Sequence, residues 1–129
     1  MWKIYKNDSE DLAFALDCLF NQSITINEFK LWLDMVLLDV NIECLPDYFF
    51  DLMDFNQDLF HITNIIGFVP HSKLSGEQEK SLIGIAYLRN VRSLYDIEID
   101  KNSAIQELDK NPEILNKFKR FFPFVEINV

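Results

Sequence analysis

Four aspartates near the middle of the chain recur at the spacing of one helix face. Asp47, Asp51, Asp54 and Asp58 are separated by four, three and four positions. On an α-helix, at about 100° per residue, this spacing places the four carboxylates within about 60° of one another. The pattern predicts an amphipathic helix with one narrow acidic stripe. Such carboxylates can bind the ammonium and guanidinium groups of a basic partner, or a metal ion.

The stripe lies in a segment that has no lysine or arginine. Between Lys30 and Lys73 the chain has seven acids and no lysine or arginine, so residues 31–72 hold −7 of the total formal charge of −9. Such a field attracts a cationic partner and repels nucleic acid. We therefore predict a surface that binds a basic protein and no nucleic acid, with a merely solvated acidic face as the plain alternative. The predicted contacts are Asp47, Asp51 and Asp54 first, then Glu43, Asp58 and Asp39, with Tyr48 as an aromatic anchor.

Calcium loops can be tested against the same spacing. The run Asp54–Asp58 begins like such a loop, but Leu59 stands where a glycine is needed and Ile65 where a bidentate glutamate is needed. The run Asp96–Asp100 matches better, yet Lys101 occupies its glycine position and would place an ammonium beside the cation. Neither run predicts a calcium site.

Motifs of enzymes are missing from the sequence. It has no nucleophile elbow, no Walker loop and no dinucleotide fingerprint. We predict no catalytic residues, no cofactor and no enzymatic activity. A small metal-dependent enzyme built on Asp54, Asp58 and His61 remains an alternative, because an acid and a histidine three positions apart occur in metal-binding bundles.

The elements that must position these residues are predicted to be helices. The 129 residues suit one domain over 1–129, and the apolar share of 49% supports a real core. Only three glycines and four prolines disfavour a turn-rich β-sandwich or barrel. We predict a mainly α fold: a single compact domain of about six helices, with at most a short strand or hairpin near the C-terminus. The helices are expected over residues 10–20, for about fourteen residues after Thr25, over 47–55, from Ser75 towards Val91, over 104–110, and from Pro112 to a stop at Pro123.

Capping residues mark several of the predicted helix starts. Thr25–Glu28 and Ser75–Gln78 have the spacing of a capping box. After Thr25, Leu37 and Leu38 widen the apolar stripe enough to predict burial on two sides. The run 96–100 alternates in polarity as a short exposed strand would. Further cap candidates are Ser9, Ser103 or Asn102, and Asn111, and Pro46 fits a first helical position.

Localisation follows from what the chain lacks. It has no apolar run of eighteen residues, and its N-terminus lacks the apolar core of a signal peptide. We expect a cytoplasmic protein that makes no membrane contact and keeps its thiols reduced. The residues assigned to the core on this basis, or on helical spacing, are Cys18, Cys44, Trp32, Phe49, Phe50 and Phe55.

Three stretches together carry a resemblance: Leu45–Phe55, Ile65–Pro70 and Leu82–Asn90. Over about residues 45–90 the chain resembles small bacterial immunity proteins of contact-dependent growth inhibition systems. The resemblance implies a cytoplasmic, acidic, single-domain protein that neutralises the C-terminal toxin domain of a sister cell's surface protein, commonly a nuclease. It is a likeness of general pattern, so it assigns no individual site residue.

The charge pattern and the resemblance lead to the same expectation. A nuclease binds a polyanion in a basic cleft, and carboxylates can occupy the places of phosphates. We expect an immunity protein that binds a cognate basic toxin domain, an RNase or DNase, as a monomer in a 1:1 complex. A generic helical adaptor for another basic protein is the first alternative.

Overall fold

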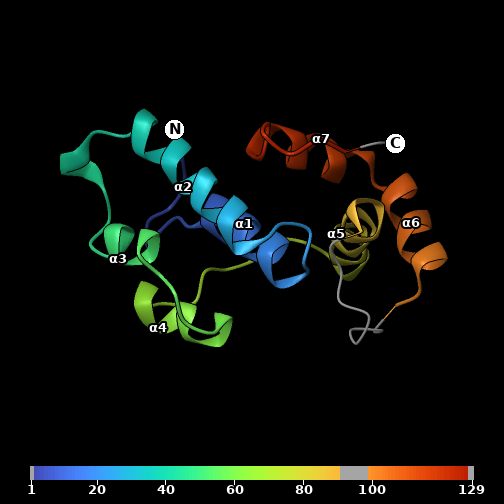
Figure 1. Ribbon diagram of the computed structural model, residues 1–129, viewed down its shortest axis with the longest axis horizontal. Helices are drawn as coiled ribbons and strands as arrows, with labels where there is room; N and C mark the ends of the chain where they lie inside the picture. Colours follow the sequence, from blue (N-terminus) through green and yellow to red (C-terminus); the bar gives the residue numbers. More distant parts are fainter. Residues whose placement is uncertain (1, 91–98, 128–129) are drawn as a thin grey trace.

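The computed structural model describes residues 2–90 and 99–127, and this part of the chain is built from helices (Figure 1). The predicted mainly α class is confirmed, and the described residues contain no strand, only one isolated bridge between Tyr5 and Asp8. Residues 96–98 of the predicted short strand lie outside the described ranges. The α-helices are α1 (Glu10–Phe20), α2 (Ile26–Asp39), α3 (Phe49–Met53), α4 (Ile62–Ile66), α5 (Gly76–Arg89), α6 (Lys101–Lys110) and α7 (Pro112–Phe121), with 3₁₀ turns η1 (Ile42–Cys44) and η2 (Leu59–His61).

Two capping boxes start the long helices α2 and α5, as predicted. The Thr25 hydroxyl accepts from the Glu28 amide at 3.2 Å, and the Glu28 carboxylate accepts from the Thr25 amide at 2.8 Å. Ser75 and Gln78 make the same reciprocal pair at the start of α5. Each box satisfies amides that have no partner inside the helix. Local sequence therefore fixes where both helices begin.

The other predicted caps are confirmed only in part. Ser9 and Asn111 occupy the N-cap positions of α1 and α7, as predicted, but neither makes a side-chain cap bond. The cap of α6 is Asp100, three residues earlier than a cap at Ser103 would be. Its carboxylate accepts from the Ser103 amide at 2.8 Å, and the bonds from Ser103 lower the pKa of Asp100. A carboxylate fits this place because the helix N-terminus is positive.

An aromatic cluster joins α1, α2 and α7 in the core. Trp32 of α2 is fully buried and stacks on Phe121 of α7 with ring centroids 6.2 Å apart. Phe14 of α1 meets the same Phe121 ring edge-on at 4.8 Å. The predicted two-sided burial of α2 is wrong, because Leu38 is 87% exposed. The predicted inner stripe of that helix is confirmed, since all its residues are buried: Phe29, Trp32, Leu33, Val36 and Val40.

Helices α5 and α6 pack so closely that one contact needs a glycine. A Cβ on Gly84 would lie 2.6 Å from the carbonyl oxygen of Ala104. Beside this contact, the Ser81 hydroxyl donates to the Glu107 carbonyl at 3.0 Å and accepts from the Asn111 amide at 3.2 Å. The α5–α7 half of the molecule is therefore held by backbone proximity as well as by apolar contact (Figure 1).

The N-terminal segment ties the other half together. Trp2 meets Trp32 edge-on at 5.5 Å, so the first described residue already packs on the core. The Tyr48 hydroxyl donates to the Ile4 carbonyl, and the Tyr5 hydroxyl donates to the Cys44 carbonyl at 2.6 Å. These bonds hold η1 and the turn before α3 against the N-terminal segment. Among the described helices, none has the length and apolar character needed to cross a membrane.

Candidate partner-binding surface

The predicted acidic helix over Asp47–Phe55 is wrong in its extent. Helix α3 has five residues, and of the four aspartates only Asp51 lies inside it. Asp47 lies in the turn before it, where the Phe49 amide bonds to the Pro46 carbonyl at 3.1 Å. Pro46 is therefore not the first helical residue.

The end of α3 removes the other two aspartates from the predicted stripe. Asp54 is the last, capping residue, and Asp58 begins η2 beyond a turn. The Phe55 amide bonds to the Leu52 carbonyl at 3.2 Å, which tightens the last turn. Asp and Asn favour caps and turns over helix interiors, so Asp54 and Asn56 suit this early stop. A continuous stripe with a common helix axis does not form.

All seven acids of residues 31–72 are nevertheless exposed. Most of them have no ion pair or side-chain hydrogen bond within residues 2–90 and 99–127. The exception is Asp39, which accepts from the Trp2 indole at 3.0 Å. The carboxylates are therefore free to meet a partner. They are Asp34, Asp39, Glu43, Asp47, Asp51, Asp54 and Asp58.

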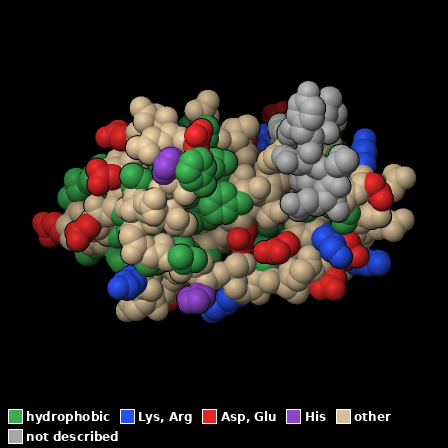
Figure 2. All heavy atoms as spheres, turned by 90° about the horizontal axis from the view of Figure 1, so that it is seen from below, with side chains coloured by type: hydrophobic (Ala, Val, Ile, Leu, Met, Phe, Trp, Pro, Cys, Tyr) green, Lys and Arg blue, Asp and Glu red, His purple; other side chains and the backbone are tan. Residues whose placement is uncertain are grey.

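Exposed apolar side chains gather in the same segment. Of the eight large apolar residues that are clearly exposed in the described structure, six belong to residues 31–72. Leu38 is 87% exposed and Phe60 is 72% exposed. In Figure 2, hydrophobic and acidic side chains are mixed at the α3 and α4 end, while most basic ones in view lie towards the other end. We call the exposed acids together with Leu38, Ile42, Phe50 and Phe60 the acidic–apolar surface.

Tyr48 does not belong to this surface. Its side chain is buried, and its hydroxyl donates to the Ile4 carbonyl. Burial raises the pKa of Tyr48 far above its usual value. Tyr48 is a core residue here, so the expected anchor role has no exposed ring to support it. Its neighbour Phe50, assigned to the core from sequence, is 48% exposed instead.

The adjacent positions of Phe49 and Phe50 on one helix could have indicated that Phe50 is exposed. Phe49 and Phe50 follow one another in α3, and consecutive side chains diverge by about 100° around the axis. Since Phe49 is fully buried, Phe50 must point away from the core. The spacing of Phe49 and Leu52 marks the inner face correctly, because both are fully buried.

The proposed metal ligands are not assembled. Asp58 and His61 stand at opposite ends of η2, and the His61 ring lies against Phe60 with centroids 4.1 Å apart. Within residues 2–90 and 99–127, no three His, Cys, Asp or Glu side chains form a group that could hold a metal ion. The metal-enzyme alternative therefore has no ligand set in that part of the chain.

The two cysteines lie in different surroundings. Cys18 is fully buried in α1, as predicted, and its burial raises the pKa of the thiol. Cys44 is exposed in η1, so its assignment to the core is wrong. Both thiols are free. The short turn η1 has no buried residue, which explains why Cys44 has no core to enter.

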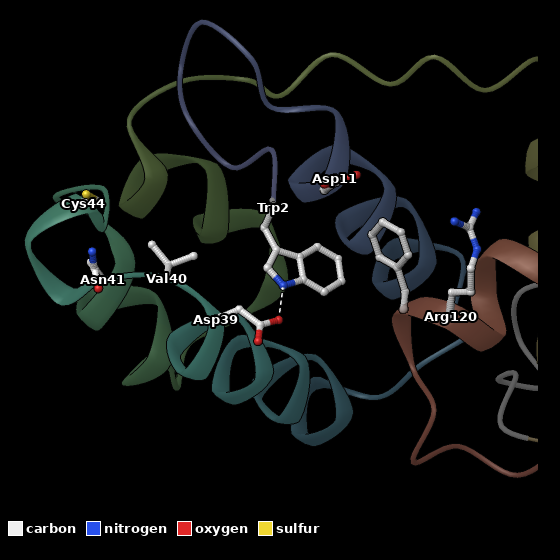
Figure 3. Close-up of a pocket in the computed structure, with 8 residues that line it drawn as sticks. Trp2, Asp11, Asp39, Val40, Asn41, Cys44 and Arg120 are labelled. Atoms are coloured by element: carbon white, nitrogen blue, oxygen red, sulfur yellow. Dashed lines mark hydrogen bonds between the residues drawn. The ribbon is translucent and has the colours of Figure 1, made fainter.

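A cavity of about 670 Å³ lies next to the acidic–apolar surface, where the Trp2 side chain lies between α2 and α7 (Figure 3). We call it the Trp2 cavity. Trp2 stands at its centre, with Asp39 below the indole and Arg120 at the α7 end (Figure 3). The Asp11 carboxylate is held by the Lys3 amide at 2.8 Å. The lining residues are Trp2, Asp11, Asp39, Val40, Asn41, Cys44, Arg120 and Phe121.

Of the residues that line this cavity, only Asp39 is among the partner contacts predicted from the sequence. Its walls come from segments far apart in the chain, and no local spacing brings Trp2 to Asp39 or Phe121. Chemically, the surface and the cavity offer carboxylates beside apolar and aromatic groups, which suits a basic protein surface. In comparisons with known proteins, no family model, no curated protein and no solved structure matches this chain.

Proposed function

We propose that this chain is an immunity protein of the contact-dependent growth inhibition type, which binds and neutralises a cognate basic toxin domain. One observation carries the proposal: every acid of a segment without lysine or arginine is exposed, and six of the eight exposed large apolar residues of the described structure lie in that same segment. The likeness of residues 45–90 to such immunity proteins supports it. A nuclease is the first toxin class to test, because its active cleft binds a polyanion.

The carboxylates act first in this proposal. Seven exposed negative charges create a field that steers a basic domain towards the surface, and such steering raises association rates to as much as about 10⁸–10⁹ M⁻¹s⁻¹ at low salt. Fast capture suits an inhibitor whose free target damages the cell. Once bound, the carboxylates cover the basic cleft where the phosphates of the substrate would lie.

The apolar side chains hold the complex together. Ile42 is 68% exposed in η1, directly before the exposed Glu43. Phe50 is 48% exposed in α3, directly before the exposed Asp51. Burial of apolar area contributes about 25 cal/mol per Å², whereas exposed ion pairs contribute little by themselves. The expected interface therefore has an apolar centre with a carboxylate rim. The protein works as a cytoplasmic monomer in a 1:1 complex.

Co-expression tests the proposal directly. The toxin domain encoded by the neighbouring upstream gene is expressed with and without this chain, and growth and complex formation on a sizing column are measured. We expect rescued growth and a 1:1 complex. No complex together with persistent toxicity would contradict the proposal.

A charge-matched pair of variants tests the surface. Replacing Asp47, Asp51 and Asp54 by Asn should weaken binding by about tenfold or more at low salt and flatten its salt dependence. The control replaces Glu77, Glu79 and Asp109, which are exposed on α5 and α6, by Gln, Gln and Asn. It removes the same charge at the other end of the molecule, so it should leave affinity within about twofold.

The alternative of a generic helical adaptor uses the same surface for another basic protein. Only the exposed acids and apolar groups support it, because they do not distinguish one basic partner from another. An adaptor would bind its partner without restoring growth in the toxin assay, and its gene would not sit beside a toxin gene.

A further inference from the structure

We propose that the Trp2 cavity is the socket for an arginine side chain of the protein partner. The identity of that partner rests on the proposed function, whereas the preference for an arginine side chain follows from the cavity lining. Trp2, Asp39 and Phe121 supply an aromatic and carboxylate lining in a space of about 670 Å³.

The carboxylate of Asp39 is held in position. Its Oδ2 atom accepts from the Trp2 indole at 3.0 Å, which leaves the other oxygen and the remaining lone pairs for a ligand (Figure 3). Trp2 itself is wedged edge-on against Trp32 at 5.5 Å and Phe121 at 5.1 Å. The Asp39 carboxylate is therefore bonded to an indole that is held in place by two other aromatic rings.

The end of α2 adds negative potential at the same place. The C-terminal end of a helix carries partial negative charge from its unpaired carbonyls, and cations normally offset it. In α2 the last turn contains no basic residue, and its final residue is Asp39. Two like-signed contributions therefore meet at the cavity wall, and a bound cation would relieve both.

Among cations, a guanidinium fits this lining best. Its planar fork pairs with a carboxylate through two parallel hydrogen bonds and stacks on aromatic rings, which an ammonium does less well. The cavity offers both features, because the Asp39 carboxylate bonds to the Trp2 indole and the Trp2 ring lines the cavity. Lysine would gain the charge attraction but not the planar contacts.

Arg120 also lines the cavity, and its charge allows a second test of the proposal. It lines the α7 end, away from Asp39, and forms no ion pair within residues 2–90 and 99–127 (Figure 3). Its charge opposes a cationic ligand and would favour an anionic one. Arg120→Gln should therefore strengthen binding of an arginine and weaken binding of a carboxylate or phosphate.

The test uses a capped arginine as the probe, Nα-acetyl-L-arginine methylamide, on the whole protein at low salt. The chain has two tryptophans, so a ¹⁵N-labelled sample has two indole signals. Trp2 reports on the cavity, and Trp32, whose indole is buried and has no hydrogen-bond partner in the described structure, is the internal reference. We expect a saturable shift of the Trp2 signal at millimolar probe and none with capped citrulline, the neutral analogue.

Two variants that each remove one negative charge distinguish a contact inside the cavity from the overall negative potential of the protein. Asp39→Asn keeps an acceptor for the Trp2 indole and should weaken the probe by about fivefold, the scale of a partly exposed ion pair. Asp34→Asn lies on the same helix, is exposed and should change affinity by less than about twofold. Arg120→Gln should tighten binding by about twofold.

Equal shifts with citrulline, or an affinity that Asp39→Asn leaves unchanged, would overturn the proposal. Weaker binding in Arg120→Gln would overturn it in favour of an anionic or zwitterionic ligand. The citrulline comparison uses the wild-type protein, so it stands even if a variant folds poorly. No toxin domain enters this titration, so its failure is distinct from failure of the co-expression test.

Discussion

Arg89 at the end of α5 reaches Glu28 in the first turn of α2 and forms an ion pair that is largely removed from water. Its Nη1 atom donates to Glu28 at 2.8 Å and to the Ser23 carbonyl at 2.6 Å. The two side chains are 12% and 19% exposed. Since Glu28 also completes the capping box of α2, this pair joins the two halves of the fold at the point where one helix begins.

Arg89→Met should therefore destabilise the protein by about 2–3 kcal/mol. The substitution leaves the partly buried Glu28 carboxylate and the Ser23 carbonyl without their hydrogen-bond donor. The expected loss of stability is smaller than for a fully buried ion pair, because both side chains retain some contact with water. Urea unfolding followed by tryptophan fluorescence measures the loss. The control is Lys110→Met, which removes a surface pair to Glu107 at 3.9 Å and should cost less than about 0.5 kcal/mol.

The pKa of Glu28 also predicts that the stability of the protein depends on pH. Burial tends to raise its pKa, but the hydrogen bonds from Arg89 and Thr25 and the charge of Arg89 outweigh burial, so the pKa lies below its usual 4.5. A depressed folded-state pKa contributes stability above the unfolded value and loses it as the pH falls through the folded one. The stability difference between wild type and Glu28→Gln should therefore narrow as the pH falls below 4.5. A difference that widens on acidification would contradict this.

Gly84→Ala should destabilise the protein by about 1–2 kcal/mol. Alanine favours a helix by about 1 kcal/mol over glycine, but its Cβ would lie 2.6 Å from the Ala104 carbonyl oxygen, and overpacking typically costs about 1–3 kcal/mol. The clash is with backbone, so α6 must shift as a whole. Gly76→Ala is the control, because nothing lies within 4 Å of a Cβ there, so it should leave stability unchanged or raise it by up to about 1 kcal/mol.

Sequence alone was sufficient where the determinants are local. The boxes at Thr25 and Ser75 depend on residues three positions apart, and both helices begin where they predict. The Arg89–Glu28 pair spans 61 positions, so no local pattern could indicate it. The Trp2 cavity was missed for the same reason, since its walls come from both ends of the chain and from α2.

The acidic stripe failed for a different reason. Helical spacing of aspartates is necessary for a shared face but does not show that the helix continues, and α3 ends at Met53. The count of charges was more reliable than their periodicity, because exposure of all seven acids needs no common helix. Leu38 shows that apolar residues can also be misassigned, since an apolar side chain in an apolar run is not always buried.

Tyr48→Phe tests the new assignment of Tyr48 to the core. Removing the hydroxyl leaves the Ile4 carbonyl without this donor in a buried place, so stability should fall by about 1 kcal/mol. Binding of the proposed toxin partner should be unchanged within about twofold, because the ring is not at the surface. Thermal unfolding and a binding titration on the same sample check both parts. Weakened binding without a loss of stability would restore Tyr48 as a contact.

Phe50→Ala is expected to separate binding from stability. Phe50 on α3 is 48% exposed within the acidic–apolar surface, and loss of its ring should weaken binding of the proposed toxin partner by about tenfold or more. Phe20→Ala is a matched control, since Phe20 ends α1 outside that surface and is 46% exposed. The two variants should lose similar stability, so only a difference in affinity distinguishes them. Equal affinities of the two variants would remove α3 from the interface, because the field of the surrounding carboxylates is unchanged in both.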